Sequence, residues 1–405
     1  MPDVPLLSTV VLNWNREDLL RTTVDSYLAT VSVPYELAIV DNASTDGSRA
    51  YIESVCAGRR NHRAILLPTN TGGEGLNVGL AECRGRFLQV SENDLEYLPG
   101  WDRELLSKFE TFPELGQLSP FSPFHQVELG EVWTDRAGIA ETRDGATLYW
   151  ALYNVTSSCL IRREVWERGV RWQAHGTKAY WSPDDGAFSR EVKRAGYRVA
   201  WNDRYVVVNW GHNVKEMARR MEYYLNNAEG KQYLGVDRLR QALADHGCEV
   251  VTAPDGRWTV EQRVPPAQSR AAERTALWRE WIGRLGEAVA ELSAVVPAGA
   301  TYLLVDDEQF GAELLPGRRA LPFIEADGSY AGAPADDAAA VRELERMRSQ
   351  GARQIVFMWP CFWWLDHYAG LREHLRTRYA CVSDTARASV FDLTAVRTTA
   401  GGGAC

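Results

Sequence analysis

The chain carries the run FLQVSENDLE at residues 87–96, and this run decides the expected fold. Its first half is typical of a buried strand, and the polarity changes abruptly at Glu92, Asn93 and Asp94. Oxygen ligands at the carboxyl end of a strand lie at the open edge of a sheet, where a divalent cation and a diphosphate can meet. The sequence therefore predicts a metal-binding strand end. A polar turn that simply closes the strand is the local alternative.

Strand and helix patterns alternate on the N-terminal side of this run. Strand-like runs occupy residues 6–12, 35–40 and 64–67, and apolar residues at helical spacing predict a helix over 17–30. This alternation predicts an α/β, Rossmann-like fold with a mainly parallel sheet and with its ligand-binding loops at one edge.

Two loops at that edge carry candidate ligand contacts. Asp41 ends the second run, where it can accept hydrogen bonds from a nucleobase, whereas Asp46 in the same loop is better explained as a helix N-cap. The third run leads into TGGEG at residues 71–75, where the backbone can approach a ligand closely. This glycine cluster is neither a Walker loop nor a G-x-G-x-x-G fingerprint.

Four segments together closely resemble family 2 glycosyltransferases of the GT-A fold, especially the rhamnosyltransferase-like group. They are TVVLNWNR at 9–16, VDNASTDGS at 40–48, NTGG at 70–73 and END at 92–94. The resemblance extends over residues 5–215 and implies an inverting transfer of a sugar from a nucleoside diphosphate donor. It implies that Asp41 contacts the base and that residues 92–94 replace the Asp-x-Asp motif of the family, with Glu92 at its first position. The donor-site residues that we expect are Leu12, Asn13, Asn15, Asp41, Asn70, Gly72, Gly73, Asn77, Glu92 and Asn93.

A second pair of carboxylates precedes an amphipathic helix in the stretch YWSPDDGAFSREVKRAG, residues 180–196. One of the pair can cap the helix while the other faces a cleft. The stretch matches the Glu-Asp motif of the family, with Asp184 in place of Glu, and the match implies that Asp185 is the general base. An inverting transfer needs such a base beside the acceptor hydroxyl. Trp181 and Asp184 are candidate acceptor contacts, although a core tryptophan and a helix cap are open alternatives.

The resemblance also implies a metal site. A histidine that follows the last strand of the domain often completes the metal or diphosphate site in the family, so His212 joins Asp94 and Glu92 as an expected ligand of Mg²⁺ or Mn²⁺.

The remainder of the chain predicts further parts. We expect the catalytic domain at 1–215, a helical connector at 216–298, a smaller α/β domain at 299–396 and a flexible tail at 397–405. Strand-like runs at 301–305, 320–324, 354–358 and 388–393, with helices at 338–349 and 364–379, define the smaller domain. It resembles a domain of undefined role that is often joined to bacterial glycosyltransferases. Residues 119–153 have no clear period and are expected to form an irregular, acceptor-facing segment.

Composition limits the functional classes. The chain has 405 residues and a formal net charge of −9 without a basic stripe, which argues against a nucleic-acid partner. It has no basic, apolar signal sequence and no apolar run of about 18 residues, so we expect neither secretion nor a membrane span. Seven scattered cysteines without C-x-x-C spacing fit a cytoplasmic protein without a zinc site.

The sequence thus favours a metal-dependent glycosyltransferase that acts on a hydroxyl of a glycan, a lipid-linked or a natural-product acceptor. The alternative is a catalytically inactive nucleotide-sugar-binding module, and a sugar nucleotidyltransferase is a second rival. The sequence leaves a homo-oligomer open.

Overall fold

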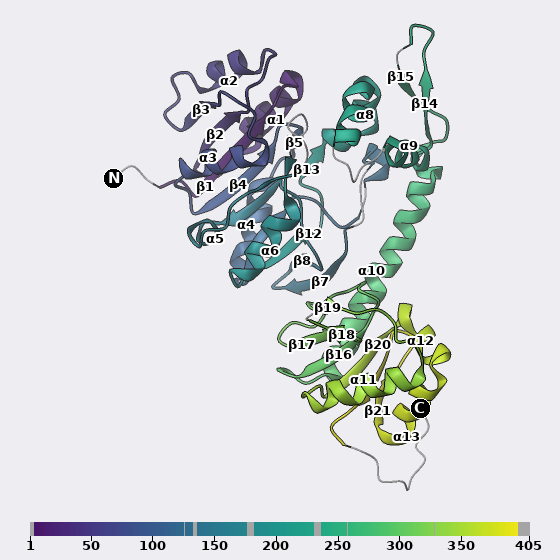
Figure 1. Ribbon diagram of the computed structural model, residues 1–405. Coiled ribbons are helices and arrows are strands. Elements are labelled where there is room, and N and C mark those ends of the chain that lie inside the picture. The colour runs from purple at the N-terminus through teal and green to yellow at the C-terminus, as the bar shows by residue number, and fades with distance from the viewer. Residues whose placement is uncertain are drawn as a thin grey trace. The chain divides into compact units, whose positions relative to one another are not determined.

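A computed structural model of the protein describes residues 4–124, 126–132, 136–175, 182–230, 236–256, 258–327 and 329–395. The chain forms two compact units, Met1–Arg279 and Glu280–Cys405, which are described separately below (Figure 1). The connector expected at 216–298 is therefore not a separate body, because most of it belongs to the first unit. Trp181 and the expected tail at 397–405 lie outside the described residues.

A nine-stranded sheet is the centre of the first unit, in the order β3-β2-β1-β4-β9-β6-β12-β8-β7. Only β9 and β8 run against the direction of the other strands of this sheet, so the mainly parallel α/β fold is confirmed. The strands are β1 (Leu7–Asn13), β2 (Tyr35–Asp41), β3 (His62–Leu66), β4 (Phe87–Glu92), β6 (Leu115–Ser119), β7 (Gly138–Arg143), β8 (Ala146–Ala151), β9 (Cys159–Arg162) and β12 (Arg198–Asn202).

Parallel pairing of β1 with both β2 and β4 brings the candidate loops together. Asn13 pairs in register with Asp41, and Leu12 pairs with Glu92, so all three strands end at one edge. β1 and β4 are buried almost throughout because they lie in the middle of the sheet. The helices of this part are α1 (Glu17–Thr30), α2 (Ser48–Cys56), α3 (Gly75–Ala81), α4 (Trp101–Thr111), α5 (Arg163–Glu167) and α6 (Asp185–Arg194).

The segment expected to be irregular at 119–153 contains the hairpin β7–β8, which extends the sheet at its edge. The hairpin turns at Asp144 and Gly145, whose φ values are 50° and 79°. Two consecutive residues with positive φ are typical of a two-residue hairpin turn, for which Asp-Gly is a favoured sequence. The prediction missed this turn because the aromatic residues around it obscure the strand period.

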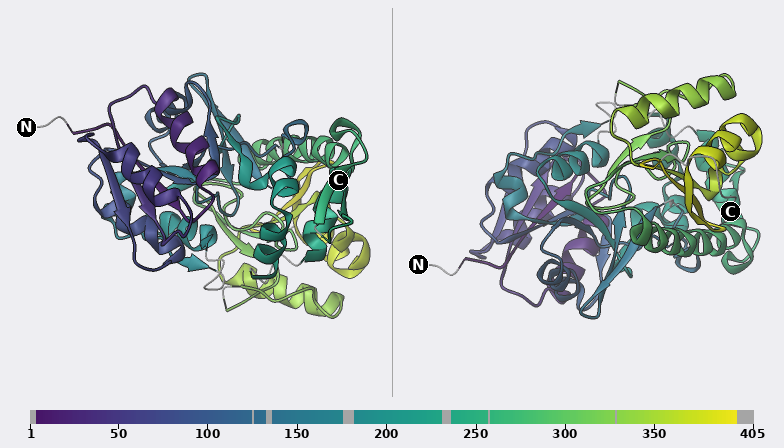
Figure 2. Two further views of the ribbon diagram at one scale, coloured as in Figure 1. Left: turned by 90° about the horizontal axis from the view of Figure 1, so that it is seen from above. Right: turned by 90° about the horizontal axis from the view of Figure 1, so that it is seen from below.

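The polypeptide after β12 continues through β13 (Val207–Asn209) and the short helical turn η3 (Trp210–His212). Helices α7 (Val214–Arg219), α8 (Met221–Gly230) and α9 (Val236–Asp245) follow, and then an unexpected hairpin of β14 (Cys248–Thr252) and β15 (Trp258–Gln262). The β-branched residues of these strands flank Pro254-Asp255-Gly256, which is a turn signal. The helix α10 (Arg270–Val295) is one continuous helix in all views (Figures 1 and 2).

The second unit has a five-stranded sheet in the order β17-β16-β20-β22-β21. The expected runs appear as β16 (Thr301–Val305), β17 (Arg319–Pro322), β20 (Gln354–Met358) and β22 (Ala388–Asp392). The expected helices appear as α11 (Asp337–Ser349), α12 (Trp363–His367) and α13 (Ala369–Arg378), whereas β21 (Ala380–Asp384) was not predicted. No helix among the described residues is both long and apolar enough to cross a bilayer.

Candidate functional site

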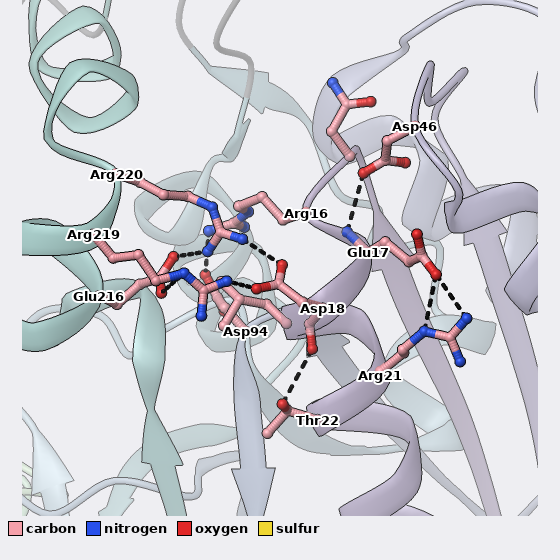
Figure 3. A network of polar contacts seen from close by, with 12 residues as sticks. Arg16, Glu17, Asp18, Arg21, Thr22, Asp46, Asp94, Glu216, Arg219 and Arg220 are labelled. Carbon is pink, nitrogen blue, oxygen red and sulfur yellow. Dashed lines mark hydrogen bonds and ion pairs between the residues drawn. The ribbon is translucent and has the colours of Figure 1, made fainter.

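The acidic end of β4 faces a cation that belongs to the chain itself. Asp94 is 8% exposed, and its Oδ2 lies 3.1 Å from a terminal nitrogen of Arg16 (Figure 3). The other terminal nitrogen of Arg16 donates to Asn93 Oδ1 at 2.5 Å. Burial lowers the pKa of Arg16, but the charges of Tyr223, Asp94, Tyr224 and Glu92 outweigh it and leave the pKa raised. The guanidinium is therefore a fixed positive charge at the strand end.

The loop after β1 positions this arginine. Asn15 and Arg16 both have positive φ, at 54° and 59°, a conformation that asparagine adopts more readily than other side chains. Asn93 Nδ2 fastens the loop by donating to Asn13 Oδ1 at 2.7 Å and to the Asn15 carbonyl at 3.0 Å. Asn13, Asn15 and Asn93 therefore meet, as predicted, but they hydrogen-bond to one another.

Asp41 lies at the expected strand end, but its side chain is fully buried. Its carboxylate accepts from Asn13 Nδ2 at 3.0 Å, from the Ser44 amide at 3.0 Å and from Arg49 Nε at 2.9 Å. Because no part of this carboxylate is exposed, a nucleobase could reach it only if the surrounding side chains moved. The structure therefore gives Asp41 the role of holding two loops together.

The glycine cluster also approaches other parts of the chain. Asn42 Nδ2 donates to the Gly72 carbonyl at 2.9 Å, and the Gly72 amide donates to Asn70 Oδ1 at 2.8 Å. Gly73 packs so tightly on Pro183 that no side chain would fit. The cluster thus brings the backbone of residues 70–73 beside the stretch that carries Asp184 and Asp185.

Two further residues expected at the donor site have structural contacts. Asn77 Nδ2 donates to the Trp172 carbonyl at 2.8 Å, and the Trp172 amide donates to Asn77 Oδ1 at 2.9 Å. Asn77 is therefore a clamp between α3 and the segment before α6. Leu12 packs against Gly75, which leaves no room for a side chain there.

The two carboxylates before α6 have different surroundings. Asp184 is the N-cap, and its Oδ1 accepts from the Ala187 amide at 2.8 Å, so one oxygen of this side chain has a structural role. Asp185 is the first residue of the helix and is half-buried. Burial raises the pKa of the Cys159 thiol, and the nearby charge of Asp185 raises it further.

Asp185 and the end of β4 are linked through adjacent residues of β9 and the turn before it. The Glu92 amide donates to Ser158 Oγ at 3.3 Å, and Cys159 pairs with Val90 of β4. The Val155 amide donates to Ser189 Oγ of α6 at 3.2 Å, so the helix that begins with Asp185 and the strand end that carries Glu92 both contact the segment 155–159.

His212 ends η3, which follows β13. The Trp210 amide donates to the Asp94 carbonyl at 2.8 Å, and Gly211 lies directly against the Asp94 carboxylate without room for a side chain. The structure thus brings residues 210–212 to Asp94. Nevertheless, the described residues contain no group of three or more His, Cys, Asp or Glu side chains that could hold a metal ion. Glu92, Asp94 and His212 do not form the expected ligand set, and the position beside Asp94 is taken by Arg16.

A cluster of arginines beyond the last strand was not predicted. Arg219 and Arg220 both pair with Asp18 of α1, and Arg220 also pairs with Glu216 (Figure 3). The ring of Tyr223 lies 5.4 Å from the Arg16 guanidinium carbon. These side chains, except that of Glu216, line a pocket of about 630 Å³ together with Trp14, Asn15, Glu17, Arg21 and Asp46. In the sequence this cluster is indicated only by the adjacent arginines at 219–220, which do not show that Asp18, about 200 residues earlier, is their partner.

Comparison with known proteins supports the resemblance. Residues 8–169 match the model of the family described as glycosyl transferase family 2. An uncharacterized glycosyltransferase of Haemophilus influenzae is 21% identical over 253 residues, which span 56% of this chain and 76% of the relative. The succinoglycan biosynthesis protein ExoO of Rhizobium meliloti is 30% identical over 106 residues, 26% of this chain and 30% of the relative. A crystal structure of S. aureus TarS 1-349 in complex with UDP-GlcNAc aligns over 59% of this chain and 72% of its own, with 16% identity and a TM-score of 0.38.

Proposed function

Because residues 8–169 form a domain of glycosyl transferase family 2, we propose that this glycosyltransferase moves a sugar from a nucleoside diphosphate donor to a hydroxyl group with inversion at the anomeric carbon. Asp185 acts as the general base. The acceptor hydroxyl belongs to a glycan, a lipid-linked or a natural-product molecule.

One observation supports the proposal above all. A half-buried carboxylate, Asp185, begins a helix near the end of β4, while its neighbour Asp184 supplies the helix cap. The helix that carries the proposed base and the strand end proposed to hold the donor therefore contact the same segment, 155–159. An inverting transfer requires a base that is separate from the leaving-group site, because the acceptor attacks the face opposite the leaving diphosphate and loses its proton there.

The proposed reaction requires different roles of the residues beside the acceptor and of those beside the donor. Asp185 has to accept the proton of the acceptor hydroxyl while it orients that oxygen for attack. The loops at 13–16 and 70–73 hold the donor through backbone groups and through side chains at their edges. The expected Mg²⁺ or Mn²⁺ supplies no step here, since Glu92, Asp94 and His212 do not form its ligand set.

A binding and turnover screen tests the proposal. The protein is heated with UDP, GDP, dTDP or CMP, each with and without Mn²⁺, and the release of nucleoside diphosphate from the matching sugar donors is then followed. Selective stabilisation by one diphosphate, with release from its sugar donor, is the expected result. Stabilisation without any release would instead favour a binding module, and no response to any compound would refute donor binding.

A further inference from the structure

We propose that Arg16 takes the place of a divalent cation in this enzyme, binding the donor diphosphate directly and stabilising it as the leaving group. The inference rests on the proposed function, because it concerns the same donor. It changes the cofactor requirement, since transfer by this route needs no metal ion.

The position of Arg16 is built by three contacts. Its terminal nitrogens bind Asp94 at 3.1 Å and Asn93 at 2.5 Å, and the Tyr223 ring lies 5.4 Å from its guanidinium carbon. The loop that carries it has two consecutive residues with positive φ, which turn the arginine toward the end of β4. Such a conformation is costly for arginine and persists only where the surroundings determine it.

Arg16 also retains an unused donor. Its Nε is buried and has no hydrogen-bond partner in the described part of the chain. A buried N–H without a partner is uncommon and calls for a ligand or another explanation. Nε itself is shielded from solvent, but 14% of the Arg16 side chain is exposed and Arg16 lines the pocket of about 630 Å³, so a phosphate bound there would meet the accessible part of the side chain.

The surroundings of Asp94 disfavour a metal ion. A divalent cation beside this carboxylate would lie next to the guanidinium and be repelled by it, in a site where water screens poorly. Gly211 packs against the same Asp94 oxygen that binds Arg16, since a Cβ at Gly211 would lie only 2.1 Å from it. The same guanidinium can also bind a diphosphate, because each terminal nitrogen carries a second N–H besides the one directed to Asp94 or Asn93.

The reaction balances without a metal. The acceptor oxygen forms a bond to the anomeric carbon as the bond from that carbon to the diphosphate oxygen breaks, and the proton of the acceptor moves to Asp185. The electron pair leaves with the diphosphate, whose added negative charge Arg16 stabilises.

Calorimetric titration of UDP, GDP and dTDP into the protein tests the inference, first in a chelator and then in Mn²⁺. For the nucleotide that binds, we expect the Kd to agree within about threefold between the two buffers, a difference under 1 kcal/mol. Arg16→Gln should weaken binding in the chelator at least tenfold, roughly the loss of one charge-assisted hydrogen bond. Arg16→Lys keeps the charge but loses Nε and the fork, and should also weaken binding.

Arg194→Gln is the matched control, because Arg194 is an exposed arginine of α6 that pairs with Glu191. It should leave the Kd unchanged. If nucleotide binding is lost in the chelator, the inference is overturned and the proposed function stays intact. An unchanged Kd in both Arg16 variants has the same meaning. The chelator comparison uses the unmodified protein and remains decisive if a variant fails to fold. Absence of binding in every buffer would refute the proposed function and this inference together.

Discussion

The change of Asp185 to asparagine is the sharpest test of the catalytic assignment. Asn keeps the size of the side chain and removes the charge that accepts a proton. General bases contribute about 10² to 10⁴ to the rate, so we expect the transfer rate to fall at least about a hundredfold, or about 2.7 kcal/mol in the barrier. The fold should be nearly unaffected, because Asp184 caps α6 through the Ala187 amide at 2.8 Å. Loss of a first-turn charge costs only about 0.3–1 kcal/mol of stability.

The adjacent residue provides a matched control. Asp184→Asn makes the same chemical change one position earlier, and asparagine caps a helix as well as aspartate does. Release of nucleoside diphosphate from the donor is measured for both variants, together with the donor Kd and the urea midpoint. We expect Asp185→Asn to bind the donor normally and turn over slowly, and Asp184→Asn to resemble the parent protein. Near-normal turnover in a folded Asp185→Asn variant would remove Asp185 from the base role, and an equal loss in both variants would indicate a structural effect.

Three further predictions follow from contacts outside the proposed chemistry. Asn77→Ala removes both hydrogen bonds to the Trp172 backbone and should lower the free energy of unfolding by about 1–3 kcal/mol, measured in urea, while a tenfold loss of donor affinity in the folded variant would return Asn77 to the donor site. Burial, together with the charge of Arg274, lowers the pKa of His246 to about 4, so the unfolded chain gains a proton first as pH falls. Stability should therefore drop between about pH 6.5 and 4 by up to about 3 kcal/mol, and His246→Gln should flatten this slope; equal slopes in the two proteins would contradict it. Burial raises the pKa of the Cys159 thiol, so iodoacetamide should modify Cys159 only after denaturation, and rapid modification of the native protein would show that the site opens.

Local sequence pattern was sufficient for most of the sheet. The strands β1, β2 and β4 were predicted within one residue because their apolar runs end in polar loops, and their parallel pairing then fixed which loops share an edge. The two hairpins were missed although their turns carry readable signals, Asp144-Gly145 and Pro254-Asp255-Gly256. In both hairpins at least one strand flanking the turn lacks a clear alternation of polar and apolar residues, so the turn residues are the main signal.

The contacts of the site were less accessible to prediction, because they join residues far apart in the sequence. Strand position suggested that Asp41 would bind the donor, and the family resemblance suggested the same for Asn77. In the structure Arg49 pairs with Asp41, and the Trp172 backbone pairs with Asn77, 95 residues further along the chain. A polar side chain at a sheet edge satisfies whichever partner the tertiary fold brings nearest, and that partner cannot be read from local pattern.

The boundary expected at residue 215 also depends on contacts between residues far apart in the sequence. Residues 216–230 have the apolar spacing of ordinary helices, which suggested a connector. Their charged and aromatic side chains instead bind the start of the catalytic domain: Arg219 and Arg220 pair with Asp18, and Tyr223 lies over Arg16. Arg16 in turn binds Asp94 at the end of β4. The segment after β13 therefore completes the surroundings of the end of β4 and belongs to the same compact unit.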